Sequence, residues 1–189
     1  SIPKWTIFSD ENNEYSIYST DSNIYSTNYV GSIEVPVKEG IPKTFTYIAT
    51  GEDYETISLF SDSIDNDEIE VFLVDVDDNV LETYDIVEKN ELYFLDSPTL
   101  YICEIYTARD FQSVKIKFGN NVNAKKLNSG DRILIKYAET QGASVEITAI
   151  GAITAFQETI TDIYGNEVEL FVSNNSSITG GRDIESLES

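Results

Sequence analysis

Alternating apolar and polar residues through the middle of the chain predict short β-strands. At 114–118, three apolar residues alternate with two lysines, so one face of this segment is apolar. Glycine and asparagine follow at 119–121 and again at 128–131, where the chain is expected to leave the sheet. Further strands are expected at 132–137 and, after Gly142, at 145–150. This stretch carries no catalytic side-chain chemistry.

The same signals predict a mainly β protein, a β-sandwich or barrel-like domain of short antiparallel strands with a short C-terminal helix start. No segment before residue 180 shows a clear helical period, although Ala108–Gln112 could form one helical turn. Asp77–Asn79 and Tyr164–Asn166 are typical of hairpin turns. Strands are expected at Trp5–Phe8, Tyr15–Tyr18, Ile33–Val37, Thr44–Ala49, Ile57–Phe60, Ile69–Asp75, Val80–Tyr84, Leu92–Leu95, Leu100–Thr107, Val114–Phe118, Ile133–Tyr137, Val145–Ile150, Ile153–Ile160 and Val168–Phe171.

Three regions of the chain differ in amino-acid composition and pattern. Residues 1–32 are rich in Ser, Asn, Asp and Tyr and suggest an N-terminal arm or strand meander, whereas 33–150 form a regular central β domain. Residues 151–189 read as a β hairpin, a loop and a helix start capped by Asp183. The chain has no methionine and stops within this first helical turn. We therefore expect a piece of a longer parent chain in which the helix continues.

The charge balance narrows the range of partners. With 34 acidic and 12 basic residues the formal net charge is −22, and such a surface repels phosphate backbones and anionic membranes. No apolar run reaches the ~20 residues that a membrane-spanning helix needs. We therefore expect neither a nucleic-acid nor a membrane partner. Like-charge repulsion should also keep the isolated chain monomeric at low ionic strength.

Histidine is absent and cysteine occurs once. Without histidine the chain cannot build a Ser-His or Cys-His nucleophile, or a zinc site with histidine ligands. The single Cys103 cannot form an internal disulfide. It lies in the apolar segment Leu100–Thr107, where we expect a packed free thiol that is not reactive.

Acidic residues are densest between residues 62 and 96, with 13 carboxylates and one lysine. Asp62–Glu68 has the closely spaced carboxylates of a calcium loop, but it lacks the glycine at the sharp turn and the distal bidentate glutamate. Asp75, Asp77 and Asp78 form a second group. We interpret both groups as solvated surface and turn residues and predict no metal site. Carboxylate pairs at the ~5–9.5 Å separation of a glycosidase arise by chance in so acidic a chain, so no catalytic residue is assigned.

Four tyrosines, Tyr15, Tyr18, Tyr25 and Tyr29, lie among polar residues near the N-terminus. They could cover a neighbouring surface of the protein. They could also form an aromatic platform for sugars, which would make the chain a carbohydrate-binding β-sandwich module of the adhesin or lectin type. Gly180-Gly181 lacks the Lys-Ser/Thr of a phosphate-binding loop, and no cofactor is expected.

Several steps marked by glycine, asparagine or tyrosine follow one another from residue 33 to residue 189. They are Val37-Lys38-Glu39-Gly40, Ile64–Val71, Phe118-Gly119-Asn120-Asn121, Gly130-Asp131-Arg132-Ile133, Tyr137–Gly142 and Gly180–Ser186. In order and spacing they resemble the baseplate J family of contractile-tailed bacteriophages, which includes the wedge protein of T-even-like phages. Asn121 stands where that family often has a second glycine, so we expect it in a left-handed conformation. Gly119 and Gly130 are expected in turns that require the conformational freedom of glycine.

The resemblance implies structural work in a virion. Proteins of this family form wedges that join around a central hub and link the tail sheath, the tail fibres and the end of the tube, without catalysis or cofactor. It implies other wedge subunits and copies of the parent chain as partners, and no small-molecule substrate. The implied location is the tail baseplate of the virion, and the host cytoplasm during assembly.

Overall fold

A computed structural model of the chain describes residues 2–10, 16–20, 34–61, 63–108, 113–140, 147, 149–156, 159, 161–162, 164–167 and 171–177. The chain divides into two compact units. The terminal unit comprises Ser1–Pro42 together with Glu139–Ser189, and the central unit comprises Lys43–Ala138. Both ends of the chain thus contribute to one unit, whereas the three-part division expected from the sequence follows the chain in order.

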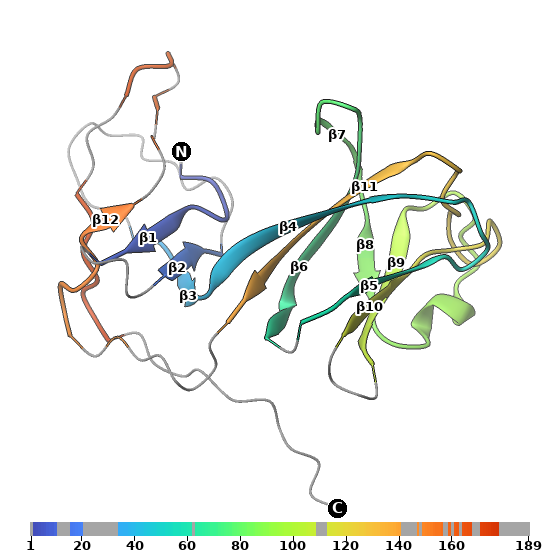
Figure 1. The fold of residues 1–189 in the computed structure, drawn as a ribbon, viewed down its shortest axis with the longest axis horizontal. Coiled ribbons are helices and arrows are strands. Elements are labelled where there is room, and N and C mark those ends of the chain that lie inside the picture. Colours follow the sequence, from blue (N-terminus) through green and yellow to red (C-terminus); the bar gives the residue numbers. More distant parts are fainter. Residues whose placement is uncertain are drawn as a thin grey trace, which may run out of the picture. The chain divides into compact units, whose positions relative to one another are not determined.

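The described secondary structure is almost entirely β (Figure 1). A single 3-10 helix, η1 (Glu91–Phe94), interrupts the strands of this part of the chain. The strands are β1 (Ile7–Ser9), β2 (Ser16–Ser19), β3 (Val37–Glu39), β4 (Ile41–Ile48), β5 (Thr56–Leu59), β6 (Ile64–Val74), β7 (Val80–Thr83), β8 (Asp85–Val87), β9 (Ile102–Thr107), β10 (Val114–Lys117), β11 (Arg132–Glu139) and β12 (Ala155–Phe156).

The central unit is a sandwich of two four-stranded sheets. One sheet has the order β4-β11-β6-β7 and the other the order β5-β10-β9-β8. The first strand of the sandwich therefore lies beside its last, and the second beside the penultimate. Pairing is antiparallel for β5–β10, β9–β10 and β6–β7, whereas β8 and β9 are parallel. One hydrophobic core joins the sheets, because its buried residues come from both.

The alternation seen in the sequence explains this core. Val114 and Ile116 of β10 are buried in it, whereas Lys115 and Lys117 of the same strand lie on the other face of the sheet. Ile133 and Ile135 enter the core from β11 in the opposite sheet. Aromatic rings fill the space next to them, since Tyr84 makes edge-to-face contacts with Phe118 and Tyr101 at centroid distances of 5.1 and 5.4 Å.

The terminal unit contains the third sheet, with the order β12-β1-β2-β3. Its core gathers residues that are distant in the sequence, including Ile2, Phe8 and Ile17 from the N-terminal part and Ile147 and Ile153 from the C-terminal part. The described part of the first 32 residues includes β1 and β2, which pair antiparallel.

The predicted mainly β fold is confirmed, and several strand assignments need correction. Among the described residues, the predicted strand Ile153–Ile160 is observed only as β12 (Ala155–Phe156). Leu92–Leu95 was predicted as a strand, but Asn90 has φ 72° and η1 follows it, with Leu92 buried and Phe94 exposed. The apolar residues of this segment therefore do not show the alternation of buried and exposed side chains that a half-buried strand has. The predicted strand Ile33–Val37 overlaps β3 only at Val37. Strand β8 was missed because three residues are too short to show a period.

Several sequence predictions lie wholly or partly outside the described residues. These are the helix start at 183–187, the Gly180–Ser186 step, the glycine at 142, most of the strands 145–150 and 168–171, the helical turn at 109–112, Asp62, and tyrosines 15, 25 and 29.

Candidate functional site

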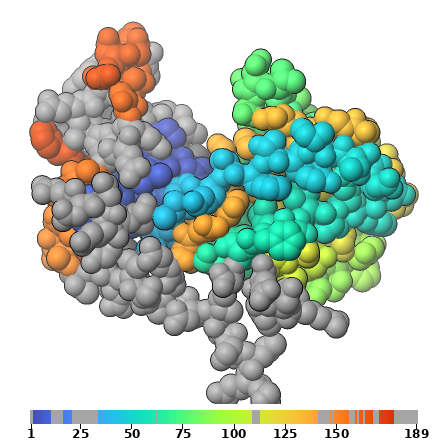
Figure 2. All heavy atoms as spheres, in the orientation of Figure 1, coloured from blue at the N-terminus to red at the C-terminus, as the bar shows by residue number. Residues whose placement is uncertain are grey.

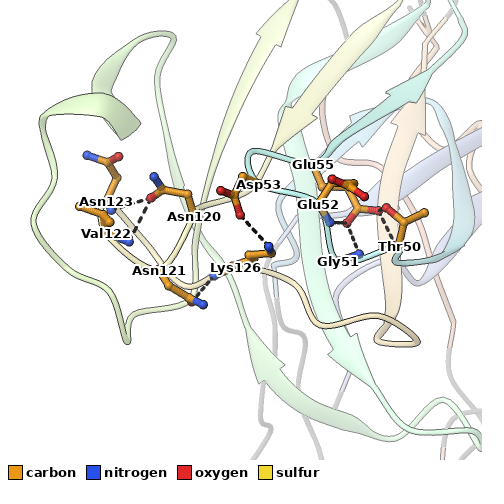
Figure 3. Close-up of polar contacts among 10 residues, drawn as sticks. All are labelled: Thr50, Gly51, Glu52, Asp53, Glu55, Asn120, Asn121, Val122, Asn123 and Lys126. Carbon is orange, nitrogen blue, oxygen red and sulfur yellow. Dashed lines mark hydrogen bonds and ion pairs between the residues drawn. The ribbon is translucent and has the colours of Figure 1, made fainter.

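Two loops, one of which carries two steps of the resemblance, lie side by side at one end of the central unit (Figure 3). They are the β4–β5 loop (49–55) and the β10–β11 loop (118–131), and together they are called the paired loops here. Backbone hydrogen bonds join them at both ends. Ala49 N donates to Asp131 O at 2.8 Å and Gly130 N to Ala49 O at 2.9 Å. Farther along, Tyr54 N donates to Gly119 O at 3.2 Å.

The glycine at 119 is required for space. A Cβ added there would lie 2.1 Å from Ala124 O and 2.3 Å from Ala124 C, because the loop folds back onto its own first residue. The φ of Gly119 is not positive, so glycine is required there by the close approach and not by backbone conformation. At Gly130 the predicted conformational freedom is used, because φ is +93°. The left-handed conformation predicted for Asn121 is also confirmed, at φ 63°.

Asparagine side chains hold the β10–β11 loop in place. Asn120 Oδ1 accepts from the backbone N–H groups of Val122 and Asn123, both at 3.0 Å, and Asn121 Oδ1 accepts from Lys126 N at 2.9 Å (Figure 3). Asn123 reaches outward, donating from Nδ2 to Leu95 O at 2.9 Å and accepting from Tyr54 OH. In this segment without secondary structure, the asparagine side chains supply hydrogen bonds that strands would otherwise form between backbone groups. They therefore stabilise the conformation of the loop.

Glu55 organises the other loop from inside. It is only 6% exposed, and its carboxylate accepts from Tyr47 OH, Thr50 N, Thr50 Oγ1, Gly51 N and Glu52 N at 2.7–3.2 Å. Burial raises the pKa of this carboxyl, but the hydrogen bonds outweigh burial and leave the pKa below its ordinary value. Its hydrogen bond to Glu55 in turn raises the pKa of Tyr47. A carboxylate that already accepts five hydrogen bonds has little capacity left for acid–base work on a substrate.

The second acidic group of the sequence is a turn, as interpreted. Asp75 Oδ1 accepts from Asp77 N and Asn79 N, and its Oδ2 accepts from Asn79 Nδ2, each at 2.9 Å. The hydrogen bond from the Asn79 side chain is the main reason that the pKa of Asp75 is lowered. Asp78 completes the turn at φ 62°.

The terminal unit repeats this arrangement. Asp162 Oδ1 accepts from Tyr164 N and Asn166 N, its Oδ2 accepts from Asn166 Nδ2, and Gly165 has φ +84°. Both predicted hairpin turns are thus confirmed, and both share the pattern Asp-x-x-x-Asn with positive φ at the fourth residue.

Neither acidic group builds a metal centre in the part of the chain that the structure describes. No three His, Cys, Asp or Glu side chains come together there in a way that could hold a metal ion. In the first group, Asp65 and Asp67 lie within the extended strand β6, where Asp65 Oδ1 accepts from Asp67 N at 3.1 Å. An extended strand cannot wrap a cation as a loop can.

The structure reveals a buried ion pair that the sequence did not suggest. Glu104 of β9 is fully buried and lies opposite Lys117 of β10, with Oε1 3.2 Å from Nζ. Its other oxygen, Oε2, has no hydrogen-bond partner among the residues that the structure describes. Desolvation lowers the pKa of Lys117, but the hydrogen bond to Glu104 outweighs it, so the net shift is upward. The ammonium also lies 4.8 Å from the centroid of the Tyr93 ring. The only indication of this pair in the sequence was a single glutamate within an otherwise uncharged predicted strand.

Two further predictions concern single side chains. Cys103 is a buried free thiol, as predicted, and burial raises its pKa well above the ordinary value. Tyr18 is fully buried and stacks on Trp5 at a centroid distance of 5.1 Å, which confirms that it packs against a protein surface. It cannot therefore belong to an exposed sugar platform.

Comparison of the chain with protein-family models, curated proteins and solved structures found no match. The family resemblance stays a prediction. None of the helices in the described ranges is long and apolar enough to cross a membrane.

Proposed function

We propose that this chain is a structural component of a phage tail baseplate wedge, without enzymatic activity or cofactor, that makes subunit contacts in the virion. Its partners would be other baseplate wedge subunits and copies of the parent chain. It would work in the tail baseplate of the virion and pass through the host cytoplasm during assembly.

The paired loops carry this proposal. Three of the residues that create the resemblance at 118–121 and 130–133 are used there as framework, because the local geometry favours the residue type found. Gly119 lies where any side chain would strike Ala124, Asn121 takes a left-handed conformation, and Gly130 takes a positive φ. A sequence pattern imposed by such local geometry indicates a shared loop architecture more strongly than surface composition does.

Charge and exposure favour a protein partner over the other classes. The net charge of −22 opposes nucleic acids and anionic membranes. Large apolar side chains are nevertheless exposed on several elements of the central unit, including Val122 within the paired loops and Phe94 beside them. Exposed apolar side chains that gather on a protein surface are typical of contacts with other proteins. Of the four tyrosines on which the carbohydrate-binding alternative rests, the one that the structure describes, Tyr18, is buried.

The decisive experiment uses the full-length parent protein. It would be tagged in the phage genome, and purified particles would be analysed by mass spectrometry and by gold labelling of the tag in electron micrographs. We expect the protein in intact particles, with label at the tail end distant from the head, and co-purification with neighbouring virion proteins after mild dissociation. Absence of the protein from particles would overturn the proposal. Label on the head or along the sheath would also contradict it.

A further inference from the structure

The hairpin between β6 and β7 exposes apolar side chains at its end. Val76 is 87% exposed, Leu81 56% and Val80 53%. These three side chains, with the carboxylates of Asp77 and Glu82 beside them, are called the hairpin tip here. Figure 2 shows the green end of this hairpin standing out from the rest of the central unit. Single exposed aliphatic residues are common, but three within six residues of a projecting hairpin are typical of a contact surface.

The backbone under the hairpin tip is already ordered. The Asp75 carboxylate accepts three hydrogen bonds within the turn, and Asp75 N donates to Asn79 O at 3.0 Å. Arg132 of β11 ties the turn to the sheet through Asp78, with NH2 2.9 Å from Oδ1. A surface that is ordered before binding loses little conformational entropy when a partner docks.

The charges of the hairpin tip restrict its partner. Asp75, Asp77, Asp78 and Glu82 stand against the single base Arg132, so the region is acidic within a chain of net charge −22. A second copy of the chain would meet it with like charge, and so would a phosphate backbone or an anionic lipid. The complementary occupant is a protein surface that carries lysine or arginine around an apolar recess.

The edge of the sheet at β7 does not favour binding by the addition of a partner strand. β7 is the last strand of its sheet, so a partner strand could in principle pair with it. The register shifts between Leu73, opposite Glu82, and Val74, opposite Val80, so Leu81 is an extra residue that forms a bulge. A bulge interrupts the regular spacing of donors and acceptors that an added strand needs. Contact through the side chains of the tip is therefore favoured.

We propose that the hairpin tip is a docking surface for a partner protein that presents basic side chains around an apolar recess. The proposal rests on the proposed function, because the partner is then a neighbouring subunit of the virion. It adds the element that makes the contact and the chemistry of the surface that receives it.

The terminal unit supplies a matched control. The turn Asp162–Asn166 has the same carboxylate hydrogen bonds and positive φ, and its Tyr164 is 77% exposed. It is followed by the exposed Glu167, where the exposed Val80 follows Asn79 in the hairpin tip. A photo-reactive phenylalanine analogue would replace either Val76 or Tyr164 in the full-length protein in assembling phage. After irradiation of purified particles, the cross-linked residues would be mapped by mass spectrometry.

We expect cross-links from position 76 to a protein surface with lysine or arginine beside apolar residues, at a yield at least tenfold above that from position 164. Equal yields, or a recipient surface without basic side chains, would overturn the docking proposal. If particles contain the protein but position 76 gives no cross-link, the docking proposal alone fails. If particles lack the protein, the proposed function fails and this inference fails with it.

Binding of the purified full-length protein to the cross-linked partner gives a second readout. Val76→Ser combined with Leu81→Ser should raise Kd at least tenfold, and Glu82→Lys should weaken binding and reduce its salt dependence. Tyr164→Ser should leave Kd unchanged. All these side chains are exposed, so the unfolding transition should not move. An unchanged Kd in the double variant, with folding intact, would overturn the proposal.

Discussion

Replacing Gly119 by alanine should destabilise the central unit severely, because the obstacle is backbone. The new Cβ would lie 2.1 Å from Ala124 O, whereas carbon–oxygen contacts normally begin at about 3.3 Å. The loop must therefore move by roughly 1 Å. That movement disrupts the hydrogen bond from Asn121 N to Ala124 O, which is 2.9 Å long. Overpacking costs about 1–3 kcal/mol and a lost hydrogen bond about 1 kcal/mol, so we expect a loss of about 3 kcal/mol.

Gly130 provides the comparison that isolates this cause. A Cβ at Gly130 meets nothing within 4 Å, so only the positive φ of +93° opposes a side chain there. Left-handed backbone costs an L-residue about 1–2 kcal/mol. Gly130→Ala should therefore cost less than Gly119→Ala by more than about 1 kcal/mol.

The assay is urea unfolding, followed by far-UV circular dichroism and by hydrogen exchange of peptides from residues 43–138. A loss of about 3 kcal/mol lowers the midpoint by roughly 1–3 M urea at ordinary values of m, and m itself should stay constant. Equal costs at the two glycines, or a larger cost at Gly130, would refute the close approach at Gly119.

Four shorter predictions follow from the same contacts. Because the pKa of Glu55 is lowered in the folded state, the stability it contributes is complete above the ordinary value of 4.5 and is lost as the pH falls through the folded pKa. In Glu55→Gln the midpoint of urea unfolding should therefore fall less steeply at acid pH than in the wild type, and an unaltered pH dependence would contradict this. Lys117→Met leaves the buried carboxylate of Glu104 without its ionic partner and should cost about 3–5 kcal/mol of stability. Glu104→Gln should cost less in the same assay, because the ammonium that it leaves behind, on Lys117, reaches solvent. EDTA should not lower the melting temperature; a drop that calcium alone reverses would reveal a metal site. Light scattering at low salt should find a monomer, and a tight dimer would refute the argument from net charge.

Strands with strict alternation could be predicted closely from the sequence. The strand predicted at Val114–Phe118 is observed as β10, and the one at Ile133–Tyr137 lies within β11. Their apolar faces are wide enough to fix which side is buried. The segment around Leu92 could not be predicted in this way, because a short apolar run fits a strand and a helical turn equally well. What decides it is the left-handed Asn90 before the run and the burial of Leu92 alone among its neighbours.

Only part of the structure of the paired loops could be predicted from the sequence. Glycine at 119 and 130 and asparagine at 121 mark turns by residue type, and the structure places all three in the β10–β11 loop. The physical reason at Gly119 was not accessible, because it depends on where the loop returns at Ala124. The role of Glu55 was likewise hidden, since nothing in the local pattern distinguishes a carboxylate that organises a loop from the 33 other acids of the chain.

The hairpin tip shows how a contact surface can be separated from a solvated acidic face. The sequence presents Asp75–Asn79 as a polar turn, and the hydrogen bonds of Asp75 explain why its polar residues are there. They do not explain Val76, which makes no contribution to the core and is 87% exposed. The twin turn in the terminal unit keeps the same aspartate and asparagine, and its sequence has Ile163 where the hairpin has Val76. Turn chemistry therefore accounts for Asp75 and Asn79, and an aliphatic residue after the aspartate is common to both turns. The hairpin tip differs in Val80, which is 53% exposed and corresponds to Glu167 of the twin turn, so this aliphatic side chain calls for a reason outside the fold, which docking supplies.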